Sequence, residues 1–171
     1  MVKIPSYQKT LRAFFEEQET VYLDSTELVG YAKKYLIANK KHVNDCAIRS
    51  LSWHFVLLSS DFVRFEVITA LRKEFKALPY ASAQIIFTDI INEFRILVIT
   101  PIDSIRLTRE FLEKCAKSRV DLKDGIHLLI SANLNVKMVT FDKKLLANKE
   151  KFYREVYSHN DIIKLKFTQK K

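Results

Sequence analysis

Glycine is scarce in this chain, which has only Gly30 and Gly125 among its 171 residues. Phosphate-binding loops of the G-x-G-x-x-G or G-x-x-x-x-G-K-[ST] type need closely spaced glycines, because a side chain would keep the backbone away from the phosphate. No such loop can be written in this sequence. Rossmann-type and P-loop nucleotide binding are therefore excluded.

Cysteine and long apolar runs are equally rare. Cys46 and Cys115 lie far apart, so no C-x-x-C pair is available to hold zinc or carry redox chemistry. We expect both to be small buried residues in a reducing compartment. No window approaches the roughly 18 apolar residues of a membrane span, and the amino terminus has no apolar signal core. These absences predict a cytoplasmic protein that makes no use of a membrane.

Positive charge is in excess. Lys and Arg total 29 against 20 Asp and Glu, which gives a formal net charge of +9. An excess of this size favours a polyanionic partner such as RNA. The alternative is that a Lys-rich surface only keeps the protein soluble. Hydrophobic residues make up 48% of the chain, enough for a packed core.

Short apolar segments alternate with amphipathic ones, and no linker rich in Pro, Gly or Ser divides the chain. Strands are predicted at 21–23, 54–59, 95–99 and 136–140, with an edge strand at 163–167. Helices are predicted at 5–17, 25–38, 44–51, 80–93 and 104–117, from 60 or 61, and from 122. This order predicts an α/β fold with a mainly parallel sheet and helices on both faces.

Aromatic residues are assigned to the core rather than to base stacking. Tyr22, Trp53 and the phenylalanines are expected to be buried. The helix that begins near residue 60 is expected to turn five side chains inward: Phe62, Phe65, Ile68, Leu71 and Phe75.

Four carboxylates occur where strands end or helices begin. Asp24 and Asp142 follow strands, Glu66 lies in the second turn of a helix, and Asp124 opens another. The carboxyl ends of parallel strands share one edge of a sheet, where function collects. Four acids meeting there would repel one another unless a cation neutralised them, and hard oxygen ligands suit Mg²⁺ or Mn²⁺. In a basic protein, such a site predicts hydrolysis of phosphodiester bonds.

Each acid also has a purely structural interpretation. Asp24 and Asp142 are suited to cap the helices that follow them, and Asp124 is suited to the positive end of a helix dipole. Glu66 is equally compatible with an exposed helix position. Asp121 is interpreted as a helix-starting residue. The joint placement of the four acids, rather than any one of them, carries the metal hypothesis.

The motifs Val21-Tyr22-Leu23-Asp24-Ser25-Thr26, Asp124-Gly-Ile-His127 and Val139-Thr140-Phe141-Asp142-Lys143, with the helix of Glu66, resemble those of PIN-domain ribonucleases. The resemblance covers about residues 20 to 157. It implies a three-layer α/β/α sandwich and an Mg²⁺- or Mn²⁺-dependent endoribonuclease. Asp24, Glu66, Asp124 and Asp142 match the metal-binding acids, and Asp24 or Asp124 would also orient the attacking water.

The resemblance has further implications. Thr140 matches a hydroxyl that braces the first aspartate, and Ser25 keeps a hydroxyl beside it. Many family members are toxins of the VapC type, so an antitoxin partner and a homodimer are expectations of the same origin. Two departures stand out: Thr26 replaces an asparagine, and residues 1–19 form a helical extension before the domain at 20–171.

Other residues have secondary roles in this interpretation. His127 is expected to be a hydrogen-bonded helix residue, with contact to the edge of the site as the alternative. RNA phosphates would be steered by exposed cations, among them Lys143, Lys144 and Arg64. The rival function is a non-catalytic RNA-binding or scaffolding module of the same fold.

Overall fold

The computed structural model describes Thr10 and residues 13–15, 17–39, 43, 47–100 and 109–168. Most of the helix expected at 5–17, the start of the one expected at 104–117, and Cys46 lie outside these residues. Phe15, from the expected extension, is buried in the core. Within the described part of the chain, none of the helices has the length and apolar character needed to cross a membrane.

Five parallel strands form the sheet. In sheet order they are β3 (Leu97–Ile99), β2 (Val56–Ser60), β1 (Thr20–Leu23), β4 (Lys137–Val139) and β5 (Val156–Tyr157). The central strand, β1, is buried along its whole length. Its apolar run Val-Tyr-Leu is what a strand covered on both faces requires. The four strands predicted at 21–23, 54–59, 95–99 and 136–140 are confirmed.

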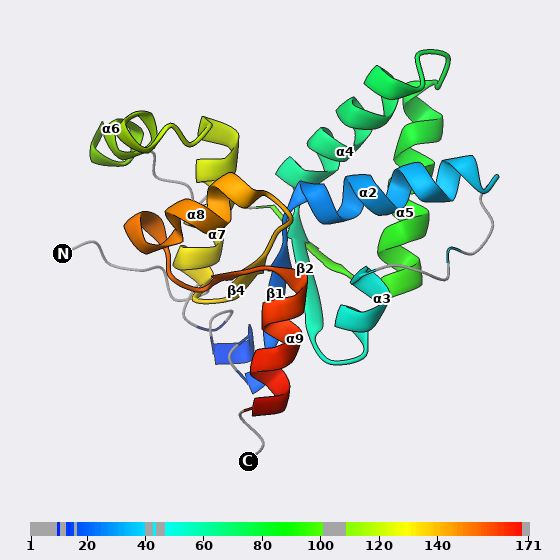
Figure 1. The fold of residues 1–171 in the computed structure, drawn as a ribbon. Coiled ribbons are helices and arrows are strands. Elements are labelled where there is room, and N and C mark those ends of the chain that lie inside the picture. The colour runs from blue at the N-terminus through cyan, green and yellow to red at the C-terminus, as the bar shows by residue number, and fades with distance from the viewer. Residues whose placement is uncertain are drawn as a thin grey trace.

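Helices cover both faces of the sheet (Figure 1). One face carries α2 (Ser25–Ile37), α3 (Ala47–Ser52), α4 (Asp61–Glu74) and α5 (Tyr80–Phe94). The other carries α6 (Arg109–Ser118), α7 (Leu122–Leu134) and α8 (Lys143–Phe152). From β1 to β3 the strands are added toward one edge of the sheet, whereas β4 and β5 are added toward the other edge. Because every crossover is right-handed, this change of direction places the later helices on the second face. The α/β class and the sandwich arrangement of helices around the sheet are confirmed.

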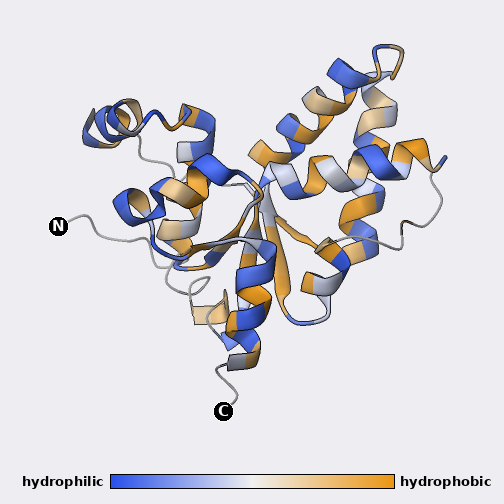
Figure 2. Ribbon diagram, in the orientation of Figure 1, coloured by the Kyte–Doolittle hydropathy of each residue, from blue (hydrophilic) through white to orange (hydrophobic). Residues whose placement is uncertain are grey.

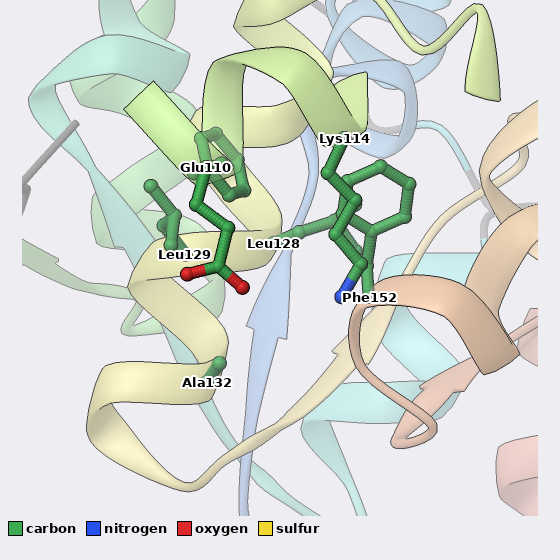
Figure 3. A pocket seen from close by; sticks show the side chains of 7 residues that line it. Glu110, Lys114, Leu128, Leu129, Ala132 and Phe152 are labelled. Carbon is green, nitrogen blue, oxygen red and sulfur yellow. The ribbon is translucent and has the colours of Figure 1, made fainter. Parts of the chain in front are cut away.

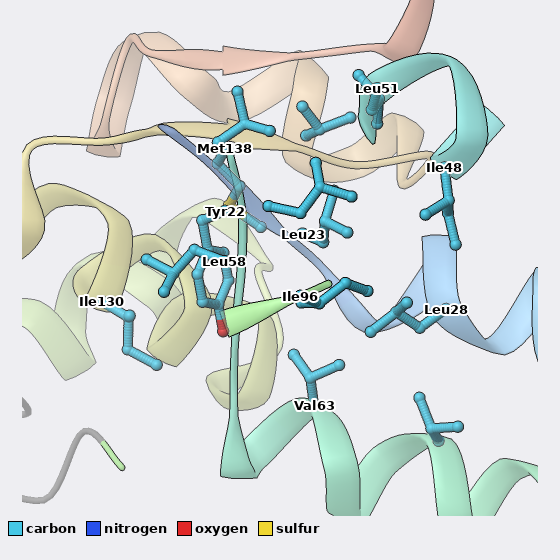
Figure 4. Close-up of a cluster of buried hydrophobic side chains, with 14 of the residues drawn as sticks. Tyr22, Leu23, Leu28, Ile48, Leu51, Leu58, Val63, Ile96, Ile130 and Met138 are labelled. Carbon is cyan, nitrogen blue, oxygen red and sulfur yellow. The ribbon is translucent and has the colours of Figure 1, made fainter. Parts of the chain in front are cut away.

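The core fills the space between the sheet and these helices. Figure 4 shows Leu23, Leu58 and Val63 among its side chains, which come from β1, β2 and α4. Each helix carries both hydrophilic and hydrophobic residues along its length, as is typical of helices that pack on one side only (Figure 2).

The predicted edge strand at 163–167 is wrong, because these residues belong to α9 (His159–Thr168). The fifth strand is β5, which the sequence analysis missed. The Ser158 hydroxyl accepts a hydrogen bond from the Asp161 N–H at 3.2 Å and donates one to the Asp161 carboxylate at 2.7 Å. This exchange resembles a capping box and fixes the start of the helix. Ile162 is then fully buried, a position that the period-two pattern did not include.

Among the described residues, six aromatic assignments are also wrong. Phe62 and Phe65 are 39% and 54% exposed, Trp53 is 74% exposed, and Phe14, Phe141 and Phe167 are exposed as well. The buried face of α4 is instead formed by Val63, Val67, Ile68 and Leu71. The predicted face was rotated by about one residue, because the large size of the phenylalanines outweighed the smaller valines in the pattern.

Candidate metal centre

Asp24 is the first residue after β1 and lies at the carboxyl edge of the sheet. Its N–H still donates to the Val139 carbonyl of β4 at 3.1 Å, and its side chain is almost completely buried. The Ser25 N–H donates to Asp24 Oδ1 at 2.6 Å, so Asp24 caps α2 as the structural interpretation expected. Capping leaves the second oxygen, Oδ2, for other partners.

Two threonine hydroxyls hold that second oxygen. Thr140 and Thr26 donate to Asp24 Oδ2 at 2.7 and 3.0 Å. Thr140 also accepts from the Asp142 N–H at 2.9 Å, and Thr26 accepts from the Phe141 N–H at 3.3 Å. The hydroxyl that the family resemblance led us to expect at Thr140 therefore contacts Asp24. Thr26, which lacks the family's amide, supplies a second hydroxyl in its place.

His127 lies at the centre of the site rather than at its edge. It projects from α7, is 1% exposed, and its Nε2 is 2.8 Å from Glu66 Oε2 and 3.8 Å from Asp24 Oδ1. The other ring nitrogen, Nδ1, is 2.8 Å from the Tyr22 hydroxyl, which is itself 2.8 Å from Ser60 Oγ. A hydrogen-bonded chain thus runs from Ser60 through Tyr22 and His127 to Glu66, and Asp24 Oδ1 lies 3.8 Å from the same ring nitrogen.

Asp24, Glu66 and His127 form one compact group. Each offers a ligand atom, and the three atoms lie within 4.8 Å of one another. Two carboxylate oxygens and an imidazole nitrogen are donors that divalent metals accept in proteins. The donor set therefore fits a divalent cation.

The charges within this group depend on one another. Burial is the largest influence on both Glu66 and His127 and favours their neutral forms. Their mutual hydrogen bond and opposite charges outweigh burial, so the pKa of Glu66 is lowered and that of His127 is raised. Hydrogen bonding from Ser25 and the charge of Lys123 also lower the pKa of Glu66. Both shifts favour the charged form of the residue concerned.

Asp124 lies near the group, in the first turn of α7, and Asp121 forms the N-cap of that helix as expected. Burial, and next the charges of Asp142, Asp24 and Asp121, raise the pKa of Asp124 to about 6. Among the described residues, Asp124 and Asp142 are not part of the compact group. The charge of Asp124 acts on His127 within the group, and the charge of Asp142 acts on Asp124. Asp142 also caps α8, accepting from the N–H groups of Lys144 and Leu145 at 2.7 and 3.2 Å.

Glu27 is a buried acid that the sequence analysis missed. It is 2% exposed, and neither carboxylate oxygen has a hydrogen-bond partner among the described residues. Burial, followed by the charge of Asp24, raises its pKa to about 8. In the sequence, Glu27 looks like an ordinary acid in the first turn of a helix, so no pattern distinguishes it.

The cations expected to steer RNA differ in their surroundings. Lys143 and Lys144 are exposed on the first turn of α8, directly after Asp142. Arg64 instead pairs with Asp61 at 3.2 Å, and its guanidinium lies over the Phe65 ring. The two lysines are therefore better placed than Arg64 to meet a phosphate near the acids.

A separate hollow of about 300 Å³ lies between α6, α7 and α8 (Figure 3). Its lining is mainly apolar, with Lys114 Nζ over the Phe152 ring. It contains none of the residues of the compact group.

Comparisons with known proteins add little to this picture. No family model matches the chain, and a search of curated proteins found no match. A solved structure described as "Crystal structure of PAE2754 from Pyrobaculum aerophilum" is similar, with 17% sequence identity and a TM-score of 0.49. The similarity covers 87% of this chain and 90% of that one. It says nothing about activity.

Proposed function

We propose that this chain is a metal-dependent endoribonuclease that uses Mg²⁺ or Mn²⁺. The observation that carries the proposal is the compact group of Asp24, Glu66 and His127, with the charge of Asp124 acting on it. The neighbouring acids raise the pKa of Asp124, which shows that their negative charges oppose its ionisation, and a bound cation would offset that repulsion. Such groups concentrate at functional sites.

Phosphodiester hydrolysis is the chemistry that this arrangement suits. A divalent cation supplies charge that polarises a phosphate and stabilises the leaving oxygen, so no side-chain nucleophile is required. Asp24 and Glu66 would hold the cation, while Thr140 and Thr26 fix the orientation of Asp24. Asp124 and Asp142 complete the acidic edge. Asp24 or Asp124 would orient the attacking water.

The charge of the protein supports RNA as the substrate. The acidic edge lies within a chain of net charge +9, and the exposed Lys143 and Lys144 directly follow Asp142. Cations beside an acidic metal site would hold the phosphates on either side of the bond to be cut.

The test is cleavage of a mixed, end-labelled RNA pool with Mn²⁺, with Mg²⁺ and with EDTA. Asp24→Asn should lower the rate by more than about a hundredfold, since even the loss of residues that only orient ligands costs about 10- to 100-fold. The matched control is Asp161→Asn, which changes an exposed acid in the first turn of α9 and should cut normally. RNA binding that is insensitive to EDTA, with no cleavage, would instead favour the non-catalytic module.

A further inference from the structure

We propose that His127 is itself a metal ligand, through Nε2, and that it makes this site prefer Mn²⁺ to Mg²⁺. The inference rests on the proposed function, because it concerns the same site. It goes beyond that function by adding a nitrogen donor to a set of acids and by naming the cation that the set selects.

The position of Nε2 is the first argument. It lies between the two carboxylates, 2.8 Å from Glu66 Oε2 and 3.8 Å from Asp24 Oδ1. A cation held by both acids would therefore meet this nitrogen as well. The ring is almost completely buried, so His127 cannot turn out into solvent to make room.

The second argument concerns the other side of the ring. A metal-bound histidine generally donates its second N–H to a fixed acceptor, which orients the ring. Nδ1 has such a partner in the Tyr22 hydroxyl at 2.8 Å, and Tyr22 has Ser60 Oγ at the same distance. The Tyr22 oxygen can accept from Nδ1–H while its own hydrogen is donated to Ser60.

These contacts determine where each hydrogen of the His127 ring goes when a metal binds. Nε2 must present its lone pair to the cation, so the hydrogen that it shares with Glu66 leaves to solvent as a proton. Nδ1 keeps its hydrogen and donates it to Tyr22. The carboxylate of Glu66, released from His127, turns its charge to the cation.

The nature of the donor sets the preference. Mg²⁺ takes oxygen ligands almost exclusively and gives up its water reluctantly, whereas imidazole nitrogen suits the transition metals. Replacing one oxygen donor by a nitrogen therefore penalises Mg²⁺ more than Mn²⁺. An all-carboxylate site would lack this discrimination.

The experiment uses the tag-free full chain, without RNA, loaded with Mn²⁺. Electron spin-echo envelope modulation should detect ¹⁴N coupled to the manganese in the natural protein. The signal should change when histidine is labelled with ¹⁵N, disappear in His127→Gln, and persist in the control His54→Gln. Calorimetry should show Mn²⁺ affinity reduced about tenfold or more in His127→Gln, in the range seen when ligand environments are altered. The weaker Mg²⁺ affinity should change much less.

Two results would overturn the inference. One is Mn²⁺ bound with no nitrogen coupling, and the other is a loss in His127→Gln that is equal for the two cations. If RNA is still cut in either case, the proposed function stands and only the role of His127 is wrong. If the natural protein binds no divalent cation, both proposals fail. Circular dichroism checks that His127→Gln is folded, and the ¹⁵N-histidine result on the natural protein decides the matter if it is not.

Discussion

Thr140 Oγ1 donates a 2.7 Å hydrogen bond to Asp24 Oδ2, across 116 residues of sequence. The bond joins the residue that follows β1 to the residue that follows β4, the neighbouring strand. Because Thr140 also accepts from the Asp142 N–H, its hydroxyl links two of the acids at the candidate site.

Removing this hydroxyl should loosen the site while leaving the fold intact. Thr140→Val keeps the shape of the side chain but leaves Asp24 without one of its donors. We expect Mn²⁺ affinity, measured by calorimetry, to fall about 10- to 100-fold, as for other residues that orient metal ligands. The free energy of unfolding should fall by about 1–3 kcal/mol, since a buried acceptor loses a partner. Thr140→Ser should behave like the natural protein, and equal losses in both variants would contradict this role.

The buried Glu27 should make the protein less stable as pH rises. Its pKa of about 8 in the folded state exceeds the ordinary value of 4.5 for glutamate, so the folded state holds the proton more tightly. Folding is therefore unpenalised below about pH 4.5, and the penalty grows until the pH passes 8. Glu27→Gln should raise the free energy of unfolding by roughly 3 kcal/mol at pH 7. Urea unfolding at pH 5 and pH 8 measures the change. Exposed Glu110→Gln is the control, and a gain independent of pH would show that the titration of Glu27 is not its cause.

The two glycines should respond in opposite directions to replacement by alanine. A Cβ at Gly125 would lie 2.8 Å from Cys115 Sγ and 3.0 Å from the Phe111 ring, so α6 would have to move away from α7. We expect Gly125→Ala to cost about 1–3 kcal/mol of stability, as overpacking does. At Gly30, nothing lies within 4 Å of the added carbon. Gly30→Ala should therefore stabilise α2 by about 0.5–1 kcal/mol. Chemical denaturation of the two variants measures both changes in the free energy of unfolding. A similar change in both would show that helix propensity, rather than packing, determines the effect at Gly125.

Lys143 and Lys144 should contribute charge rather than shape to RNA binding. Replacing both by alanine should weaken binding of single-stranded RNA and lower the slope of log affinity against log salt by about 1.4, roughly 0.7 for each phosphate contact. The double variant Lys73→Ala with Lys76→Ala, at the far end of α4, controls for the loss of two positive charges. An unchanged slope in the double variant would show that RNA does not contact this turn. Filter binding across a salt series provides the measurement.

Much of the fold could be predicted because its signals are local. The apolar runs around Tyr22 and Leu58 are too short for helices, and their alternation with helical segments determines a parallel sheet. The prediction of a strand at 163–167 was wrong because it also relied on a local pattern. Ile163, Leu165 and Phe167 alternate with lysines, and this alternation is typical of a strand. The deciding contact, between Ser158 and Asp161, lies just before the alternating segment.

The site could be predicted only in part. The ends of the strands located Asp24 and Asp142, because topology alone brings those positions to one edge. The sequence predicts that His127 is a helix residue with at most a contact to the edge of the site. Its central place depends on the Tyr22 hydroxyl and on Glu66, which come from two other elements. The unusual properties of Glu27 follow from its burial, and no pattern of residue spacing in the sequence predicts that burial.

The central position of β1 has a consequence for when the site can exist. β1 pairs with β2 on one side and with β4 on the other, and its own sequence lies before both. While the chain is being made, Asp24 emerges long before His127 and Thr140, so the first half of the chain holds acids but no site. The site is complete only when β4 has paired with β1. Any chemistry at the site therefore requires that the second half of the chain has folded.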